Sequence, residues 1–228
     1  MNSIITIYSI SLTVVVYCLV RKVSQRYPSP FTTPVFLGTA IVILILLGSS
    51  VTYNEYVTAK DIMTYLLGPA TVALAVPLYR NRGLLRKYLI PAIVGLSMGT
   101  TVTILLAIYI AKMFHLAKYM LASLSIKSVT IPVASEISKI IGADAILVAG
   151  IVMMTGMCGA MFGPWLMNKF NIHHPFARGL AIGAMAHGIG TAEVAKEGEL
   201  QGAVAGVAMG IAAILISTVL PFVLPHLI

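Results

Sequence analysis

The sequence predicts an all-α, polytopic membrane protein with about seven transmembrane helices and with discontinuous or re-entrant segments near 127–132 and 187–192, and three observations support this prediction. First, 59% of the 228 residues are hydrophobic and 10% are charged, and the mean hydropathy is +0.97. A soluble domain of this length has no interior large enough for so much apolar surface. Second, long apolar stretches recur along the chain. Third, polar and helix-breaking residues interrupt two of these stretches, near 127–132 and 187–192.

Six of the apolar stretches are uninterrupted and long enough to cross about 30 Å of hydrocarbon at about 1.5 Å per residue. They are Ile4 to Val20, Pro34 to Ser50, Ile62 to Tyr79, Tyr88 to Ala111, Ala143 to Met167, and Gly202 to Leu224. Two weaker stretches, Tyr119 to Ile141 and Gly179 to Ala195, contain the interruptions. Residues 1–228 are expected to form a single integral membrane domain.

Basic loops indicate which helix ends face the cytoplasm. The loops at 21–26 and 80–87 each hold several Lys or Arg residues and are separated by two crossings. Both are therefore expected inside, with the N-terminus outside. The acidic loop with Glu55 and Asp61 is then expected outside. The net charge of +8 reflects this orientation, and no nucleic-acid partner is expected.

The segment Tyr119 to Ile141 leaves two topologies open. If it enters and leaves the membrane on one side, Lys169 and Arg178 lie inside. Glu197 and Glu199 then lie outside, and the chain crosses seven times. If the segment spans fully, the last basic loop lies outside. The distribution of Lys and Arg favours re-entry.

A weak internal repeat is also present. A shift of 57 residues places Ser128-Val129 on Thr71-Val72 and Gly156 on Gly99. Apolar sequence of low complexity produces such matches by chance as well. A true repeat would be typical of secondary transporters, whose repeated units bring broken helices together near the bilayer midplane.

The first interruption, Lys127 to Pro132, is a candidate anion-binding site. Proline removes a backbone donor and disfavours helix at the preceding residue, so Pro132 is expected to open the helix. Lys127 supplies a cation, and Ser128 and Thr130 supply hydroxyl groups. The alternative is that Lys127 snorkels to an interface and Pro132 makes a tolerated kink. Glu136 is a candidate for proton coupling. Alternatively, it only forms an i,i+3 ion pair with Lys139 on a water-exposed face.

The second interruption is His187 to Glu193. Gly188 and Gly190 allow a non-helical turn or the close approach of another backbone, and Thr191 adds a hydroxyl. His187 can exchange a proton near neutral pH, so it is a candidate for binding substrate or carrying a coupled proton. Glu193 is a further candidate for proton coupling. Alternatively, the small residues serve helix packing and His187 is a hydrogen-bonded structural residue.

A third segment, Gly68 to Pro77, is expected to be kinked or unwound because Pro69 and Pro77 lie about two turns apart. Thr71 is a candidate for lining the cavity there, although a structural kink is the favoured interpretation. The sequence contains no metal-ligand cluster, phosphate-binding loop or nucleophile triad. No metal, cofactor or enzymatic activity is therefore expected.

Three stretches together resemble the LrgB/CidB family: Leu67 to Tyr79, Lys127 to Ala134, and Ala177 to Gly183 followed by His187 to Ala192. Each motif alone has low specificity, but the order and spacing of the three are specific. The resemblance covers nearly the whole chain. It implies a protein of the bacterial cytoplasmic membrane, described as a holin/antiholin-like modulator of murein hydrolase activity and autolysis. Such proteins act with a small LrgA/CidA-type membrane partner. Related plastid proteins move glycolate and glycerate, and bacterial ones are linked to pyruvate.

Two functions therefore stay open. The first is a secondary transporter of small monocarboxylates, in which Lys127 and half-helix N-termini hold the carboxylate and His187 carries a proton. In this hypothesis a hydroxyl or keto oxygen of the substrate is held by Ser128, Thr130 and Thr191. The second is a holin-like pore or regulator, which needs only an oligomerising, lipid-compatible bundle. Small-residue faces such as Gly95-x-x-x-Gly99 also make a homodimer plausible.

Overall fold

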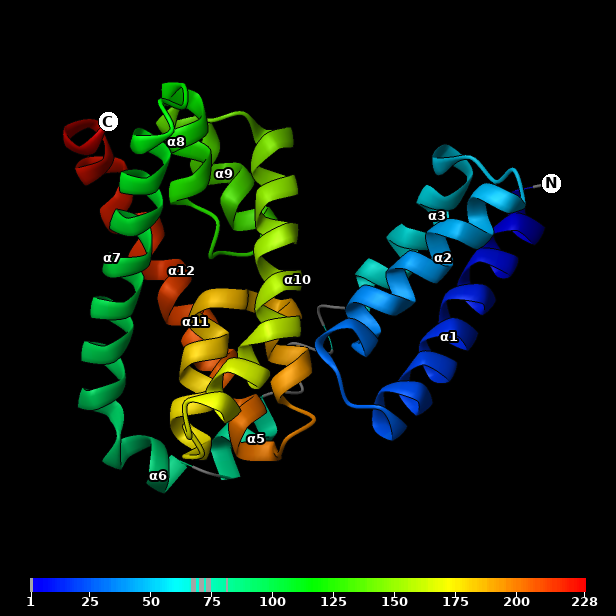
Figure 1. The fold of residues 1–228 in the computed structure, drawn as a ribbon, viewed down its shortest axis with the longest axis horizontal. Helices are drawn as coiled ribbons and strands as arrows, with labels where there is room; N and C mark the ends of the chain where they lie inside the picture. Colours follow the sequence, from blue (N-terminus) through cyan, green and yellow to red (C-terminus); the bar gives the residue numbers. More distant parts are fainter. Residues whose placement is uncertain (1, 67–68, 70–71, 73–74, 81) are drawn as a thin grey trace. The chain divides into compact units, whose positions relative to one another are not determined.

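The computed structural model describes residues 2–66, 69, 72, 75–80 and 82–228, and every regular element in these ranges is a helix. The chain divides into two compact units, Met1–Ala75 and Val76–Ile228. Both are drawn in Figure 1. All-helical architecture is confirmed. Thr71, a candidate of the sequence analysis, lies outside the described residues, as do several of its neighbours in the third segment.

The first unit contains α1 (Asn2–Arg26), α2 (Thr39–Gly48) and α3 (Tyr53–Tyr65), with a π-helical turn, Pro34–Gly38, leading into α2. The hydroxyl groups of Thr13 and Tyr56 lie 3.2 Å apart and join α1 to α3. The prediction of an acidic loop is wrong, because Glu55 and Asp61 lie on α3. The helix starts early since Glu55 accepts a hydrogen bond from the backbone N–H of Thr52 at 2.8 Å, which forms a capping box. This bond also holds the pKa of Glu55 below its usual range.

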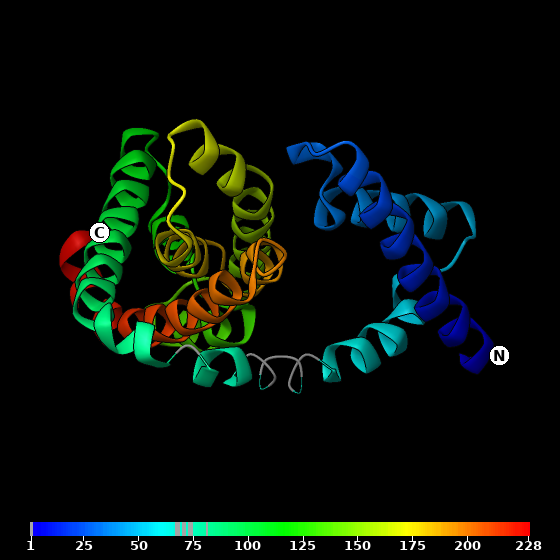
Figure 2. The same cartoon turned by 90° about the horizontal axis from the view of Figure 1, so that it is seen from below.

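The short helix α5 (Ala75–Arg80) starts at the last residue of the first unit and leads into the second. The second unit continues with the short helix α6 (Arg82–Lys87) and with α7 (Leu89–Met113), α8 (Lys118–Ser125) and α9 (Ile131–Ile141). It ends with α10 (Ala145–Lys169), α11 (Pro175–Val194) and α12 (Glu199–Leu227). The long helices α7, α10 and α12 run between the two ends of the unit (Figure 1). The shorter helices α8, α9 and α11 pack between and against them (Figure 2).

Four described helices are long and apolar enough to cross a membrane: Ile4–Arg26, Leu89–Met113, Ala145–Lys169 and Glu199–Leu227. A shorter apolar helix covers Pro34–Gly48. The chain is therefore a multi-pass membrane protein. The predicted count of seven crossings is not confirmed.

The first interrupted segment forms a re-entrant hairpin, here called hairpin 1 and comprising Lys118–Ile141. Short connections join it to the end of α7 at Met113 and to the start of α10 at Ala145, and both points lie at the same end of the unit (Figure 1). The eight residues of α8 reach about 12 Å inward at about 1.5 Å per residue. Of the two predicted topologies, the structure has the re-entrant one.

The second interrupted segment is also a hairpin, here called hairpin 2 and comprising Pro175–Glu197. At His187 the backbone adopts φ 40° and ψ −136°, which is not helical, and the chain reverses. A Cβ atom at Gly190 would lie only 2.7 Å from Cγ2 of Ile182, so the two arms pack on each other. Arg178 at the start of the hairpin and Glu197 at its end form an ion pair of 2.5 Å.

This ion pair overturns one prediction. The sequence predicts that Gly179 to Ala195 crosses the membrane and places Glu197 opposite Arg178. The two side chains instead lie together, because the reversal at His187 returns the chain to the end from which it entered. The segment is re-entrant and does not cross.

The two hairpins enter the second unit from opposite ends, and their spacing supports the internal repeat. The helices that precede them, α7 and α10, each contain 25 residues and begin 56 residues apart. Thr130, which precedes α9, and His187, which precedes the second arm of α11, are 57 residues apart. The second unit therefore resembles two inverted units of one helix and one hairpin, completed by α12.

Candidate functional site

The first break, residues 126–130, separates α8 from α9 and holds a cation without a carboxylate partner. Lys127 is half-buried, and its Nζ donates a hydrogen bond to the buried hydroxyl of Ser128 at 3.3 Å. None of the ion pairs among the described residues includes Lys127. A charge at this depth is costly unless it is paired or wetted, so Lys127 is a ready partner for an anion.

The N-terminus of α9 lies directly beside this lysine. Thr130 is its N-cap residue, with extended backbone angles, and its hydroxyl makes no capping hydrogen bond. Pro132 occupies the first turn, where a missing N–H breaks no helical bond. Pro132 therefore begins a helix and does not kink one. The free amides of a helix N-terminus carry a partial positive charge, which favours an anion at the same place.

The second break is centred on His187, whose side chain is 4% exposed. Its Nε2 lies 3.0 Å from the carbonyl oxygen of Val152 on α10. The hydroxyl of Thr191 donates to the carbonyl of His187 at 2.8 Å and so supports the turn from within. There is space around Gly188, since a Cβ atom placed there would meet only Sδ of Met209, at 4.0 Å. The space at Gly190, by contrast, is filled closely by the opposite arm.

Val152 links the two breaks. Its side chain belongs to the same buried cluster as Ile126 and Val129, which flank Lys127 and Ser128. Its carbonyl oxygen meets the imidazole of His187. Val152 therefore shares an apolar cluster with the tip of hairpin 1 and lies within hydrogen-bonding distance of the tip of hairpin 2.

Both acidic candidates lie on helices, outside the non-helical residues 126–130 and His187. Glu136 is exposed and forms an ion pair of 2.7 Å with Lys139 on the surface of hairpin 1. Glu193 forms one of 2.6 Å with Lys196 near the end of hairpin 2. Of the three candidates for proton coupling, His187 alone lies in a break. Among the described residues, no group of three or more His, Cys, Asp or Glu could hold a metal ion.

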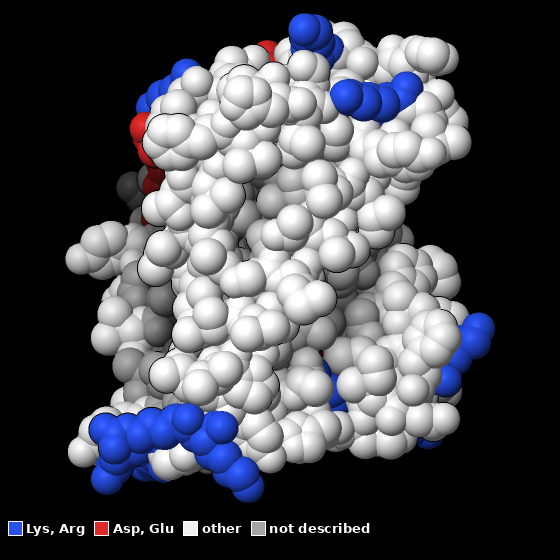
Figure 3. Space-filling view, turned by 90° about the vertical axis from the view of Figure 1, so that its left-hand side faces the viewer, with Lys and Arg blue, Asp and Glu red and all other residues white. Residues whose placement is uncertain are grey.

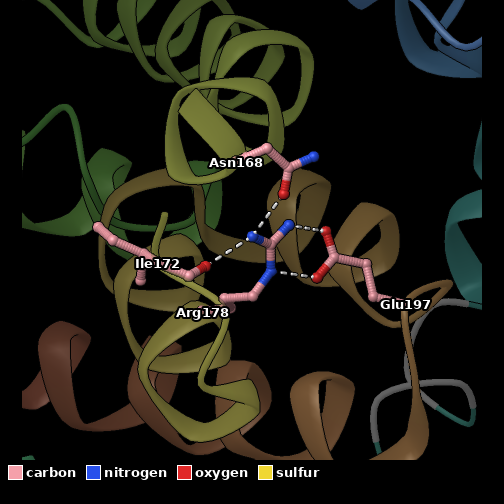
Figure 4. Close-up of polar contacts among 4 residues, drawn as sticks. All are labelled: Asn168, Ile172, Arg178 and Glu197. Atoms are coloured by element: carbon pink, nitrogen blue, oxygen red, sulfur yellow. Dashed lines mark hydrogen bonds and ion pairs between the residues drawn. The ribbon is translucent and has the colours of Figure 1, made fainter. Parts of the chain in front are cut away.

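A polar network at the base of hairpin 2 is not predicted by the sequence (Figure 4). Arg178 donates to both carboxylate oxygens of Glu197, at 2.6 and 2.5 Å. Its Nη1 also donates to Oδ1 of Asn168 and to the carbonyl of Ile172, both at 2.9 Å. The guanidinium therefore joins the end of α10, the following connection and both ends of the hairpin. Because the pair is 19 residues apart, only knowledge of the reversal would have revealed it.

Cavities of the second unit lie beside α7. One of about 340 Å³ is lined mainly by small residues of α7 and α11, among them Gly95, Gly99 and Ala181. Another of about 280 Å³ lies between α7 and α12. Neither is lined by residues of the two breaks, so the candidate site does not open into these cavities in this conformation.

Comparisons with known proteins agree on one family. The model of the LrgB-like family matches residues 13–226. The chain is 36% identical to "Uncharacterized protein YwbG" of Bacillus subtilis, over 96% of this chain and 98% of the relative. It is 28% identical to "Holin-like protein CidB" of Staphylococcus epidermidis, over 81% of this chain and 80% of the relative. No solved structure matches the chain.

Proposed function

Since this chain belongs to the LrgB-like family, we propose that it is a secondary transporter of small monocarboxylates, such as glycolate, glycerate, pyruvate or lactate, and is linked in this way to the control of autolysis. One observation carries the proposal. Lys127 is a half-buried cation at a helix break, it has no carboxylate partner among the described residues, and it lies beside an uncapped helix N-terminus.

In this proposal the residues of the breaks have distinct roles. Lys127 and the amides of α9 hold the carboxylate, while Ser128 and Thr130 bond a hydroxyl or keto oxygen. His187 carries the coupled proton, and Gly188, with its neighbours Gly190 and Thr191, shapes the turn that presents it. A single unpaired cation suits a substrate with one negative charge.

The arrangement of the hairpins also favours a carrier. A transporter needs a site that is reached alternately from the two sides of the membrane, and two hairpins that enter from opposite ends and both pack on α10 suit this need. A pore that only disrupts the membrane has no use for a half-buried lysine without a carboxylate partner, since the charge is costly in hydrocarbon.

Orientation follows from the charges at the two ends of the second unit. On the face drawn in Figure 3, Lys and Arg gather at the ends and leave a broad uncharged band between them. The end where α7 begins and α10 ends carries Arg80, Arg82, Arg86, Lys87, Lys169, Arg178 and Lys196. The opposite end carries Lys112, Lys118 and Lys139. We propose that the first end faces the cytoplasm of a bacterium and that the N-terminus lies outside.

Uptake into liposomes tests the proposal. The purified protein should take up labelled glycolate with saturation. Lys127→Gln should raise KM about 10- to 100-fold, because it removes a charge-assisted hydrogen bond worth about 1.5–3 kcal/mol. Lys139→Gln, which removes an exposed lysine from hairpin 1, is the matched control and should leave uptake unchanged. Equal uptake by wild type and Lys127→Gln would contradict the assignment.

The second candidate is a holin-like pore or regulator of murein hydrolase activity, favoured by the name of the relatives, "Holin-like protein CidB". It would act with a small LrgA/CidA-type membrane protein or as a homodimer. In liposomes it would release solutes of many kinds without saturation, and Lys127→Gln would not alter the release. The same experiment therefore separates the two functions.

A further inference from the structure

The tip of hairpin 2 fits against a row of glycines on α10. A Cβ atom at Gly159 would lie 2.5 Å from the Cβ of Ala186. At Gly163 it would collide with the side chain of Ile182. These contacts confirm the close helix packing that small residues predict. Gly156 belongs to the same row, but its neighbour is a side chain that can exchange a proton.

A side chain at Gly156 would displace the imidazole. Its Cβ atom would lie 2.6 Å from Cε1 and 2.7 Å from Nε2 of His187, and 3.0 Å from Cδ1 of Ile189. Real carbon atoms do not approach so closely, and the buried ring has little space to retreat. The imidazole of His187 can therefore occupy its observed position only because residue 156 is a glycine.

The glycine at 156 also allows the imidazole of His187 to reach the backbone carbonyl of Val152. In an α-helix the carbonyl of Val152 accepts from the N–H of Gly156, four residues later, and it retains a second lone pair. Helical side chains lean toward the N-terminus, so a side chain at 156 would cover this oxygen. With glycine there, Nε2 of His187 reaches it at 3.0 Å. Because a carbonyl can only accept, Nε2 carries the proton.

We propose that Gly156 is a positioning residue for His187. Because it has no side chain, it leaves the Val152 carbonyl oxygen accessible to Nε2 of His187, which fixes the imidazole as the Nε2–H tautomer. Nδ1 is then the ring atom that takes up and releases a coupled proton. The Val152 carbonyl and the backbone of Gly156 lie against the ring, and neither of them is charged. The coupling role rests on the proposed transport function, whereas the positioning of the ring does not.

Nitrogen NMR of the full chain labelled with ¹⁵N-histidine tests the positioning directly. His187→Gln identifies the signal of His187 among the 5 histidines. Wild type and Gly150→Ala should show the Nε2–H tautomer, since nothing lies within 4 Å of a Cβ atom at Gly150 on the same helix. Gly156→Ala should lose the preference for this tautomer. An unchanged tautomer in Gly156→Ala would overturn the proposal.

A second variant decides the matter if Gly156→Ala does not fold. In Gly156→Ala/His187→Ala the imidazole is absent, so the new methyl group at position 156 no longer collides with it. Folding and thermal stability should therefore be restored, and the effects of the two substitutions on stability should be strongly non-additive. If the double variant remains as unstable as the single one, Gly156 does not act through His187, and the proposal fails.

Transport measurements then connect the positioning to coupling. The ratio of proton-driven uptake to exchange without a gradient should fall at least about tenfold in Gly156→Ala and in His187→Gln. It should be unchanged in Gly150→Ala. If even the wild type moves no carboxylate, the proposed function fails, while the tautomer still decides whether Gly156 positions the ring. If Gly156→Ala changes the tautomer but not the ratio, the coupling role of Nδ1 is wrong.

Discussion

The two hairpins of the second unit share a design but differ in how they are fastened. Hairpin 2 is tied by polar bonds at both ends, with Arg178 at its base and His187 at its tip. The side-chain hydrogen bonds of hairpin 1 are local, such as those from Ser123 to Tyr119 and from Ser125 to Ala122. Its contacts with α7, α10 and α12 are mostly apolar.

This difference bears on how a carrier would work. Apolar contacts are not directional, so a segment held by them can shift without breaking a buried polar bond. Hairpin 1, which carries Lys127, is therefore expected to move more readily than hairpin 2. The cation without a carboxylate partner, Lys127, is on hairpin 1, whereas the polar bonds of Arg178 and His187 hold hairpin 2 in place.

The two hairpins would no longer be alike if hairpin 2 crossed the membrane, and cysteine labelling tests this. In a background without Cys18 and Cys158, single cysteines at His173 and Glu199 should react with a membrane-impermeant maleimide from the same side. A cysteine at Lys112 should react only from the other side. Labelling of positions 173 and 199 from opposite sides would contradict the re-entrant fold of hairpin 2.

Arg178→Ala should have the largest effect on stability. It leaves the carboxylate of Glu197 partly buried and unpaired, which costs about 3–5 kcal/mol for buried pairs. Lys139→Ala removes an exposed pair and should cost less than about 1 kcal/mol. Thermal unfolding in detergent measures the stability of both variants. Similar unfolding midpoints would contradict the role of Arg178 in anchoring hairpin 2.

Hydrogen exchange should distinguish the tips of the two hairpins. We expect the backbone amides of Leu124 to Ser128 to exchange at least about tenfold faster than those of Ala186 to Thr191, because local opening is easier where fewer polar bonds must break. The measurement is mass spectrometry of the protein in lipid nanodiscs. Slower exchange at hairpin 1 would reverse the proposed division between moving and anchored hairpins.

The smallest expected effect is that of Thr191→Val. The hydroxyl already bonds the carbonyl of His187, so its loss should cost about 1 kcal/mol of stability and should change KM for glycolate little. Ser128→Ala is the comparison on hairpin 1 and should raise KM more. A larger rise in KM for Thr191→Val would place substrate recognition on hairpin 2.

Much of this fold can be predicted from apolar runs and helix breakers. Pro132 marks the first break because its effect on the chain is local. The glycines at 188 and 190 mark the second. The exact point of the reversal cannot be predicted, because it is His187 and not a glycine that adopts the positive φ, which side chains rarely do. The Arg178–Glu197 pair depends on that reversal, and the early start of α3 depends on a capping box rather than on apolar residues.

The most direct test of the central claim is whether Lys127 recognises the negative charge of a carboxylate. Unlabelled lactate and its neutral amide, lactamide, would compete with labelled glycolate for uptake into liposomes containing wild type, Lys127→Gln or Lys139→Gln. We expect lactate to compete and lactamide to fail in wild type and in Lys139→Gln, and this discrimination to disappear in Lys127→Gln. Equal discrimination in all three proteins would contradict the assignment of the carboxylate site to the first break.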